Sequence, residues 1–191
     1  MKQIIKSEHS KILEQNLKYS KPNDRKKIVP ILIKEQFGFC VYTEYPINSV
    51  AVAVDIEHFK PKSKFPNEED NYENWFAASH HFNIKKSSKW KDEMLYPTDE
   101  YLENRLYYNK MRHSYYAKSN DIAAKNLIAL VDLNNFELVN ERKNYIQNLR
   151  NEIDNRGYSI NEVFKYGRLI MFRRAIKACF PDFNGSLNNL F

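Results

Sequence analysis

The spacing of apolar side chains predicts helices in the first and last thirds of the chain. Residues 7–19 and residues 136–156 carry apolar side chains three or four positions apart, which is the spacing of one helix face. Residues 28–37 are apolar enough for a buried helix. We expect that helix to begin at Pro30, where a missing N–H costs little, and to end at Gly38, which readily takes a left-handed conformation.

The middle of the chain changes from a strand pattern to a helix pattern. Three elements are expected there: a β-branched strand at 50–54 that continues to His58, a proline-bounded loop at 60–70, and a helix from Asn74 or Trp75 to about Lys86. Alternation along the strand places Asp55 and Glu57 on one face and His58 on the other. A strand end or bulge near His58 would be needed to bring Glu57 and His58 to one site.

The remaining elements complete an α+β fold. A hairpin turning at 109–112, or alternatively a helix, is followed by a helix from Asp121 to Val131 with Ile122 inward. A last helix runs from Ser159 to about Lys177. The tail after it could pack against the rest of the protein through Leu187, Leu190 and Phe191. The length fits a single domain over 1–191. Its parts are N-terminal helices at 7–37, a small core at about 38–91, and a helical part at 120–180.

Charge and cysteine content bound the class of protein. The chain has 30 Lys and Arg against 24 Asp and Glu, a net charge of +6. That excess suits a polyanion such as nucleic acid, although many ordinary soluble proteins share it. Cys40 and Cys179 do not make a disulfide framework, and we find neither a signal peptide nor a membrane-spanning run. We therefore expect a soluble, cytoplasmic protein.

One stretch carries the candidate chemistry. It contains Val54-Asp55-Ile56-Glu57-His58-Phe59-Lys60-Pro61-Lys62-Ser63, followed by Asn74 and Asn83. An acidic residue directly before a histidine, with two later asparagines, is typical of a hydrolytic metal site. Each residue also has a plain structural interpretation: Asp55 and Glu57 as solvated strand residues, His58 as a hydrogen-bonded core residue, Asn74 as a helix N-cap, and Asn83 as a surface residue.

These residues resemble the HNH endonucleases, whose ββα-metal motif carries an acid–His pair, a loop Asn and a helical third ligand. The look-alikes are HNH proteins of retron-type and Septu-type anti-phage operons, which share an "IEHFRPKS" run and an "ACxxCNxxK" run. Residues 133–142, Leu-Asn-Asn-Phe-Glu-Leu-Val-Asn-Glu-Arg, are similar to their "LNRPELVExR" segment. The resemblance covers roughly residues 30–150.

The resemblance implies a role for each residue of the motif. Glu57 and Asn83 would bind a divalent metal, Mg²⁺ or Mn²⁺, and His58 would be the general base. Asn74 would fix the loop or orient the imidazole. Lysines on both sides of the motif could hold phosphates, or could simply be solvated: Lys60, Lys62, Lys64, Lys85, Lys86 and Lys89.

The chain departs from these relatives at the structural zinc site. Where the look-alikes have two CxxC pairs, this sequence reads Cys40, Thr43, Ser79 and Phe82. One thiol cannot make a four-sulfur site, and adjacent helical residues such as His80 and His81 point about 100° apart. We therefore expect no structural zinc, with Cys40 as a small buried residue and Phe82 in the core.

The resemblance leads to a functional expectation. The chain would be a metal-dependent HNH endonuclease that hydrolyses DNA phosphodiester bonds in a prokaryotic antiviral defence system, with an ATPase partner. Two alternatives remain open at this point. One is a catalytically inactive HNH-like subunit that binds nucleic acid or protein, and the other is a nuclease acting on RNA such as tRNA.

Overall fold

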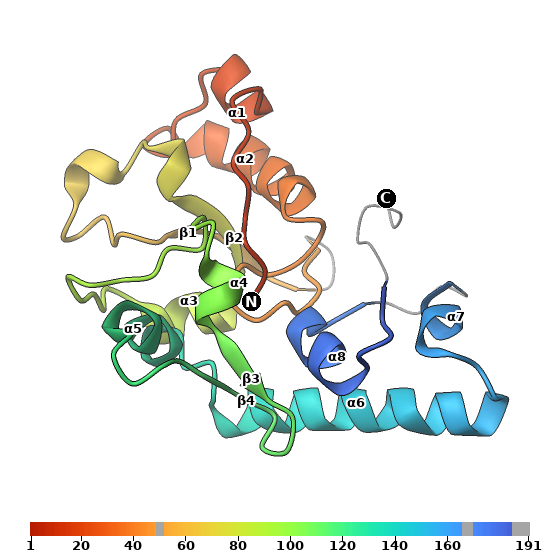
Figure 1. The fold of residues 1–191 in the computed structure, drawn as a ribbon. Coiled ribbons are helices and arrows are strands. Elements are labelled where there is room, and N and C mark those ends of the chain that lie inside the picture. Colours follow the sequence, from red (N-terminus) through yellow and green to blue (C-terminus); the bar gives the residue numbers. More distant parts are fainter. Residues whose placement is uncertain (49–51, 166–169, 185–191) are drawn as a thin grey trace.

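The structure of the chain, a computed structural model, describes residues 1–48, 52–165 and 170–184 (Figure 1). Within these ranges it combines helices with two small antiparallel sheets of two strands each, so the fold is α+β, as expected. None of the helices in these ranges has the length and apolar character needed to cross a membrane.

The first two helices are α1 (Lys11–Glu14) and α2 (Pro22–Glu35). The prediction that a helix begins at Pro30 is wrong, because α2 already begins at Pro22 and Pro30 lies inside it. Proline suits the first turn of a helix, where its missing N–H has no partner to lose. Ile28 and Leu32 are buried on either side of Pro30, so packing holds the helix through it. The chain leaves the helix before Gly38, which has the expected left-handed backbone with φ 76°.

Strands β1 (Val54–His58) and β2 (Trp75–Ser79) form an antiparallel hairpin, and helix α3 (His80–Lys86) follows directly. The pairing runs without interruption from Val54–Ser79 to His58–Trp75, so β1 has no bulge near His58. The helix predicted from Asn74 or Trp75 begins only at His80. Residues 75–78 pair with β1 and are buried, which favours the strand over the helix there.

The next elements are α4 (Leu102–Arg105), β3 (Tyr107–Asn109), β4 (Ser114–Tyr116) and α5 (Ile122–Leu130). Strands β3 and β4 confirm the predicted hairpin. Asp121 caps α5 by accepting a hydrogen bond from the Ala124 N–H, as predicted. The inward position predicted for Ile122 is wrong, because α5 faces the core through Ala124, Leu127 and Leu130 and leaves Ile122 47% exposed.

The C-terminal part contains α6 (Phe136–Arg156), α7 (Ile160–Lys165) and α8 (Arg173–Cys179). Helix α6 has the predicted bounds and ends at Gly157, whose φ of 65° is left-handed. The prediction of one last helix is wrong, because Ile170 and Phe172 are buried outside helical structure and Phe172 has a left-handed backbone before α8. The tail contacts predicted for Leu187, Leu190 and Phe191 lie outside the described residues.

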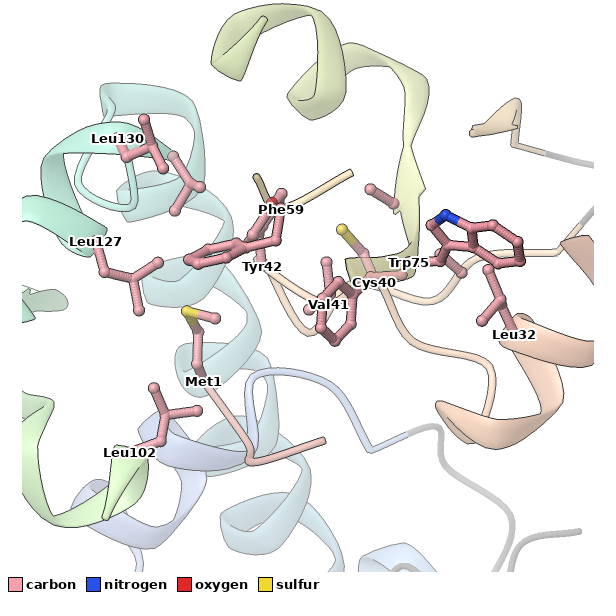
Figure 2. Packing of buried hydrophobic residues seen from close by; sticks show 14 of the residues in the cluster. Met1, Leu32, Cys40, Val41, Tyr42, Phe59, Trp75, Leu102, Leu127 and Leu130 are labelled. Atoms are coloured by element: carbon pink, nitrogen blue, oxygen red, sulfur yellow. The ribbon is translucent and has the colours of Figure 1, made fainter. Parts of the chain in front are cut away.

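Buried apolar side chains form two clusters. In the first, Tyr42, Phe59 and Trp75 pack with Leu32 of α2 and Leu127 of α5 (Figure 2). The second joins the C-terminal half of α6 to α7 and α8. The long helix α6 runs along one side of the molecule (Figure 1). The hairpin β1–β2 therefore belongs to the first cluster, which holds it between the N-terminal helices and α5.

Candidate active site

Strand β1 presents its two acidic residues to helix α3. The side chain of Asp55 contacts His80 and Asn83, and the side chain of Glu57 contacts Lys86. His58 points to the other face, where its ring lies against Tyr19 of the N-terminal segment. The regular strand therefore separates Glu57 from His58, which the alternation of the sequence had indicated.

Glu57 lies in a buried pair with Lys86. Its Oε1 is 2.6 Å from the Lys86 Nζ and accepts a hydrogen bond from the Tyr42 hydroxyl at 2.7 Å. The Lys86 ammonium also donates to the carbonyl oxygen of His58 at 2.9 Å. Glu57 is 3% exposed and Lys86 0%. Burial raises the pKa of Glu57, and the nearby Lys86 ammonium opposes that shift.

This pair gives Glu57 and Lys86 roles that differ from the expected ones. Glu57 was expected to bind a metal together with Asn83, but Lys86 supplies its positive partner and Asn83 contacts Asp55 instead. Lys86 was expected to hold phosphate, yet its ammonium faces inward. The residues around Glu57 therefore do not fit a divalent ion, because the Lys86 ammonium already lies 2.6 Å from the Glu57 Oε1 and would repel a second cation.

A second polar cluster lies at the start of α3. The Asp55 Oδ2 accepts hydrogen bonds from the His80 Nδ1 at 2.8 Å and from the Asn83 Nδ2 at 2.7 Å. The side chains of Asp55 and His80 are 31% and 54% exposed. Neither Asp55 nor His80 is among the residues to which the resemblance gave a catalytic or metal-binding role. The spacing of His80 and Asn83 was the available signal, since residues three apart share one helix face.

His58 is held in one tautomer by a backbone carbonyl. Its Nε2 lies 2.9 Å from the carbonyl oxygen of Glu69, which also accepts a hydrogen bond from the Trp75 Nε1 at 2.8 Å. A carbonyl oxygen only accepts, so Nε2 carries the hydrogen and Nδ1 is the nitrogen that can take up a proton. Burial lowers the pKa of His58, and the residue as a whole is 7% exposed.

Asn74 fastens the loop that carries the Glu69 carbonyl. Its Oδ1 accepts a hydrogen bond from the Lys60 N–H at 2.7 Å, and its Nδ2 donates to the carbonyl oxygens of Lys60 and Glu68 at 3.0 and 3.3 Å. The N-cap role considered for Asn74 is wrong, because a strand follows it. Asn74 therefore acts on His58 indirectly, by positioning the loop.

The expected phosphate-binding lysines differ in their freedom. Lys62, Lys64 and Lys89 are exposed, although the Lys62 Nζ also lies 3.7 Å from a Glu69 oxygen. Lys60 is ion-paired with Glu68 at 2.7 Å, and the Lys85 Nζ lies 3.4 Å from a Glu137 oxygen. Lys62 stands 4.7 Å above the ring of Tyr19, which covers His58. Lys62 therefore lies next to Tyr19, which contacts the His58 imidazole.

At the positions that the sequence comparison aligned with zinc-binding cysteines, Cys40 is 2% exposed, and its sulfur accepts a hydrogen bond from the Ser79 N–H at 3.5 Å. Phe82 was expected in the core but is only half-buried. In the part of the chain that the structure describes, no three His, Cys, Asp or Glu side chains are grouped so that they could hold a metal ion.

Comparison with known proteins gives no relative from which a role could be taken. No protein-family model matches the chain, and no curated protein matches it. The residues and their geometry therefore carry the functional argument.

Proposed function

We propose that this chain is an HNH-type endonuclease that hydrolyses phosphodiester bonds of DNA, with His58 as its general base. The observation that carries the proposal is the contact between the His58 Nε2 and the Glu69 carbonyl at 2.9 Å. This contact leaves Nδ1 as the basic nitrogen. The order of the hairpin β1–β2 and helix α3 is also the order of elements that a ββα core requires.

The chemistry asked of His58 is the removal of a proton from an attacking water. An imidazole suits this task near neutral pH, and a positioned base contributes roughly 10²–10⁴ in rate. Because burial lowers the pKa of His58, the ring is neutral at pH 7 and able to accept the proton. Asn74 supports the reaction as a positioning residue, since it fastens the loop that orients the ring.

The substrate is proposed from charge and resemblance together. Lys62 and Lys64 are exposed on the loop that follows His58, and Lys89 is exposed after α3, so each of these two segments offers an ammonium group to a phosphate. Lys86 is left out because it is buried. An ATPase partner and a role in antiviral defence stay expectations that rest on the resemblance alone.

A plasmid-nicking assay tests the role of His58. Purified wild type, His58→Ala and His9→Ala are incubated with supercoiled plasmid in the presence of Mg²⁺ or Mn²⁺. We expect wild type and His9→Ala to nick at the same rate, because His9 is an exposed histidine outside the site. His58→Ala should be slower by about 10²–10⁴-fold. Equal rates for wild type and His58→Ala would contradict the proposal, and a labelled RNA in the same reactions separates the two nucleic acids.

The buried surroundings of the acid–His pair favour a second candidate, a binding subunit without catalysis. Glu57 is neutralised by Lys86, and His58 is only 7% exposed. Such a subunit would retain salt-sensitive DNA binding in both wild type and His58→Ala, without nicking by either. A gel-shift assay on the same preparations therefore separates the candidates.

A further inference from the structure

The cluster of Asp55, His80 and Asn83 offers the donor atoms that a divalent ion requires. A carboxylate oxygen, an imidazole nitrogen and a side-chain amide meet at one point, because both other residues donate to the Asp55 Oδ2. Turning the Asn83 amide over exchanges its Nδ2 for Oδ1, which is a metal ligand. In the other neutral tautomer of the imidazole the hydrogen is on Nε2, and the His80 Nδ1 then offers a lone pair to a metal ion.

The backbone holds these three side chains in place. Asp55 is paired with Ala78 in the hairpin, and the His80 N–H donates to the carbonyl oxygen of Ala53 at 2.9 Å. This bond joins the start of α3 to the beginning of β1. Asn83 lies three positions after His80, on the same face of the helix. The donors are thus fixed by a strand, a helix and the bond between them.

Charge also distinguishes this cluster from its neighbour. Glu57 has a lysine partner, whereas among the described residues the only basic side chain that contacts Asp55 is His80. The side chains of Asp55 and His80 are 31% and 54% exposed, so a hydrated ion can reach them. A carboxylate that is open to water and lacks a permanent cation is the better place for an exchangeable metal.

We infer that Asp55, His80 and Asn83 form a binding site for a divalent transition-metal ion such as Mn²⁺. As a cofactor site of the nuclease, it rests on the proposed function, but ion binding stands on these contacts alone. The imidazole sets the preference, because nitrogen ligands suit first-row transition metals whereas Mg²⁺ prefers oxygen ligands throughout. The site therefore takes Mn²⁺ more tightly than Mg²⁺.

Isothermal titration calorimetry of the full chain with MnCl₂ and with MgCl₂ tests the inference. Wild type should bind one Mn²⁺, and Asp55→Ala, His80→Ala and Asn83→Ala should each bind it at least about tenfold more weakly. His80→Ala should also lose the preference for Mn²⁺. The matched control is His81→Ala, which removes the adjacent exposed histidine and should bind Mn²⁺ as wild type does. Circular dichroism melting curves verify that each variant is folded.

Three results would overturn the inference: no Mn²⁺ binding by wild type, unchanged binding by His80→Ala, or an equal loss in His81→Ala. The nicking assay separates this failure from failure of the proposed function. Mn²⁺ binding that depends on His80, without His58-dependent nicking, would keep the ion site and reject the nuclease. Nicking that depends on His58 but not on Asp55 or His80 would keep the nuclease and reject the site as its cofactor site.

Discussion

The two carboxylates of strand β1 share one face, yet their surroundings differ in depth, charge and purpose. Glu57, at the inner end, is 3% exposed and is neutralised by the Lys86 ammonium at 2.6 Å. Asp55 lies two positions closer to the surface, with a 31% exposed side chain, and contacts His80 and Asn83. A strand with one repeating pattern thus makes a structural ion pair and an open polar cluster side by side.

The difference shows that depth decides what an acidic residue can do. Removing one partner of a buried pair leaves an uncompensated charge, so the loss of either Glu57 or Lys86 destabilises the fold. The side chains of Asp55 and His80 are partly exposed to solvent, so removing either one leaves no unpaired charge in the interior. In this hairpin, ligand binding is therefore expected at Asp55 and not at Glu57.

The largest effect should come from breaking the inner pair. Lys86→Met leaves Glu57 buried without its cation, and we expect a loss of about 3–5 kcal/mol in the free energy of unfolding, measured by urea denaturation at pH 7. The matched control is Lys85→Met on the same helix, with a partly exposed side chain, which should change the free energy by no more than about 0.5 kcal/mol. A similar loss in both variants would mean that the Glu57–Lys86 pair contributes no more to the free energy of unfolding than a partly exposed lysine does.

A smaller effect should appear as a pH dependence of that loss. The pKa of Glu57 is raised above its ordinary value of 4.5, so above pH 4.5 and up to the folded pKa the folded state binds more protons than the unfolded state. Stability falls as the pH rises through this interval. The Lys86 ammonium lowers the pKa of Glu57, so its removal extends the interval upward. Lys86→Met should therefore be less destabilising at pH 5 than at pH 7.

The double variant Glu57→Gln/Lys86→Met is the control for this pH dependence. It has no carboxylate to titrate, so its difference from Lys86→Met should shrink as the pH falls. A constant difference between pH 5 and pH 7, measured by urea denaturation, would show that Glu57 does not titrate in this range.

The smallest effect is expected at the outer carboxylate. Asp55→Asn removes a charge that is partly exposed and faces a histidine, so stability should change by no more than about 0.5 kcal/mol. Urea denaturation of Asp55→Asn and Lys86→Met under the same conditions compares their free energies of unfolding. A loss of several kcal/mol for Asp55→Asn would contradict the division between a structural and an open carboxylate.

Long periodic segments and clear caps were predictable from the sequence. The bounds of α6, its end at Gly157 and the Asp121 cap of α5 follow from local rules, because spacing and capping depend on nearby residues. The boundary between β2 and α3 was not predictable in this way. Residues 75–78 are apolar enough for either element, and pairing with β1 selected the strand.

That boundary also determined which site residues were missed. The predicted helix already contained His80 and Asn83, but with its start at Asn74 or Trp75 the sequence did not show which residues of β1 they would face. With the correct start, His80 and Asn83 face Asp55 together. The partner of Glu57 was equally hidden, because two adjacent lysines give no local sign of which one is buried.

The sequence by itself determined the kinds of groups available: two acids and a histidine at a strand end, two asparagines, and a set of lysines around them. It also determined that Asp55 and Glu57 share a face, since alternation is a property of any strand. Only the tertiary structure decided which acid meets Lys86 and which meets His80 and Asn83. Those choices depend on where α3 begins and how deeply each end of β1 is buried, and both are set by contacts between segments far apart in the chain.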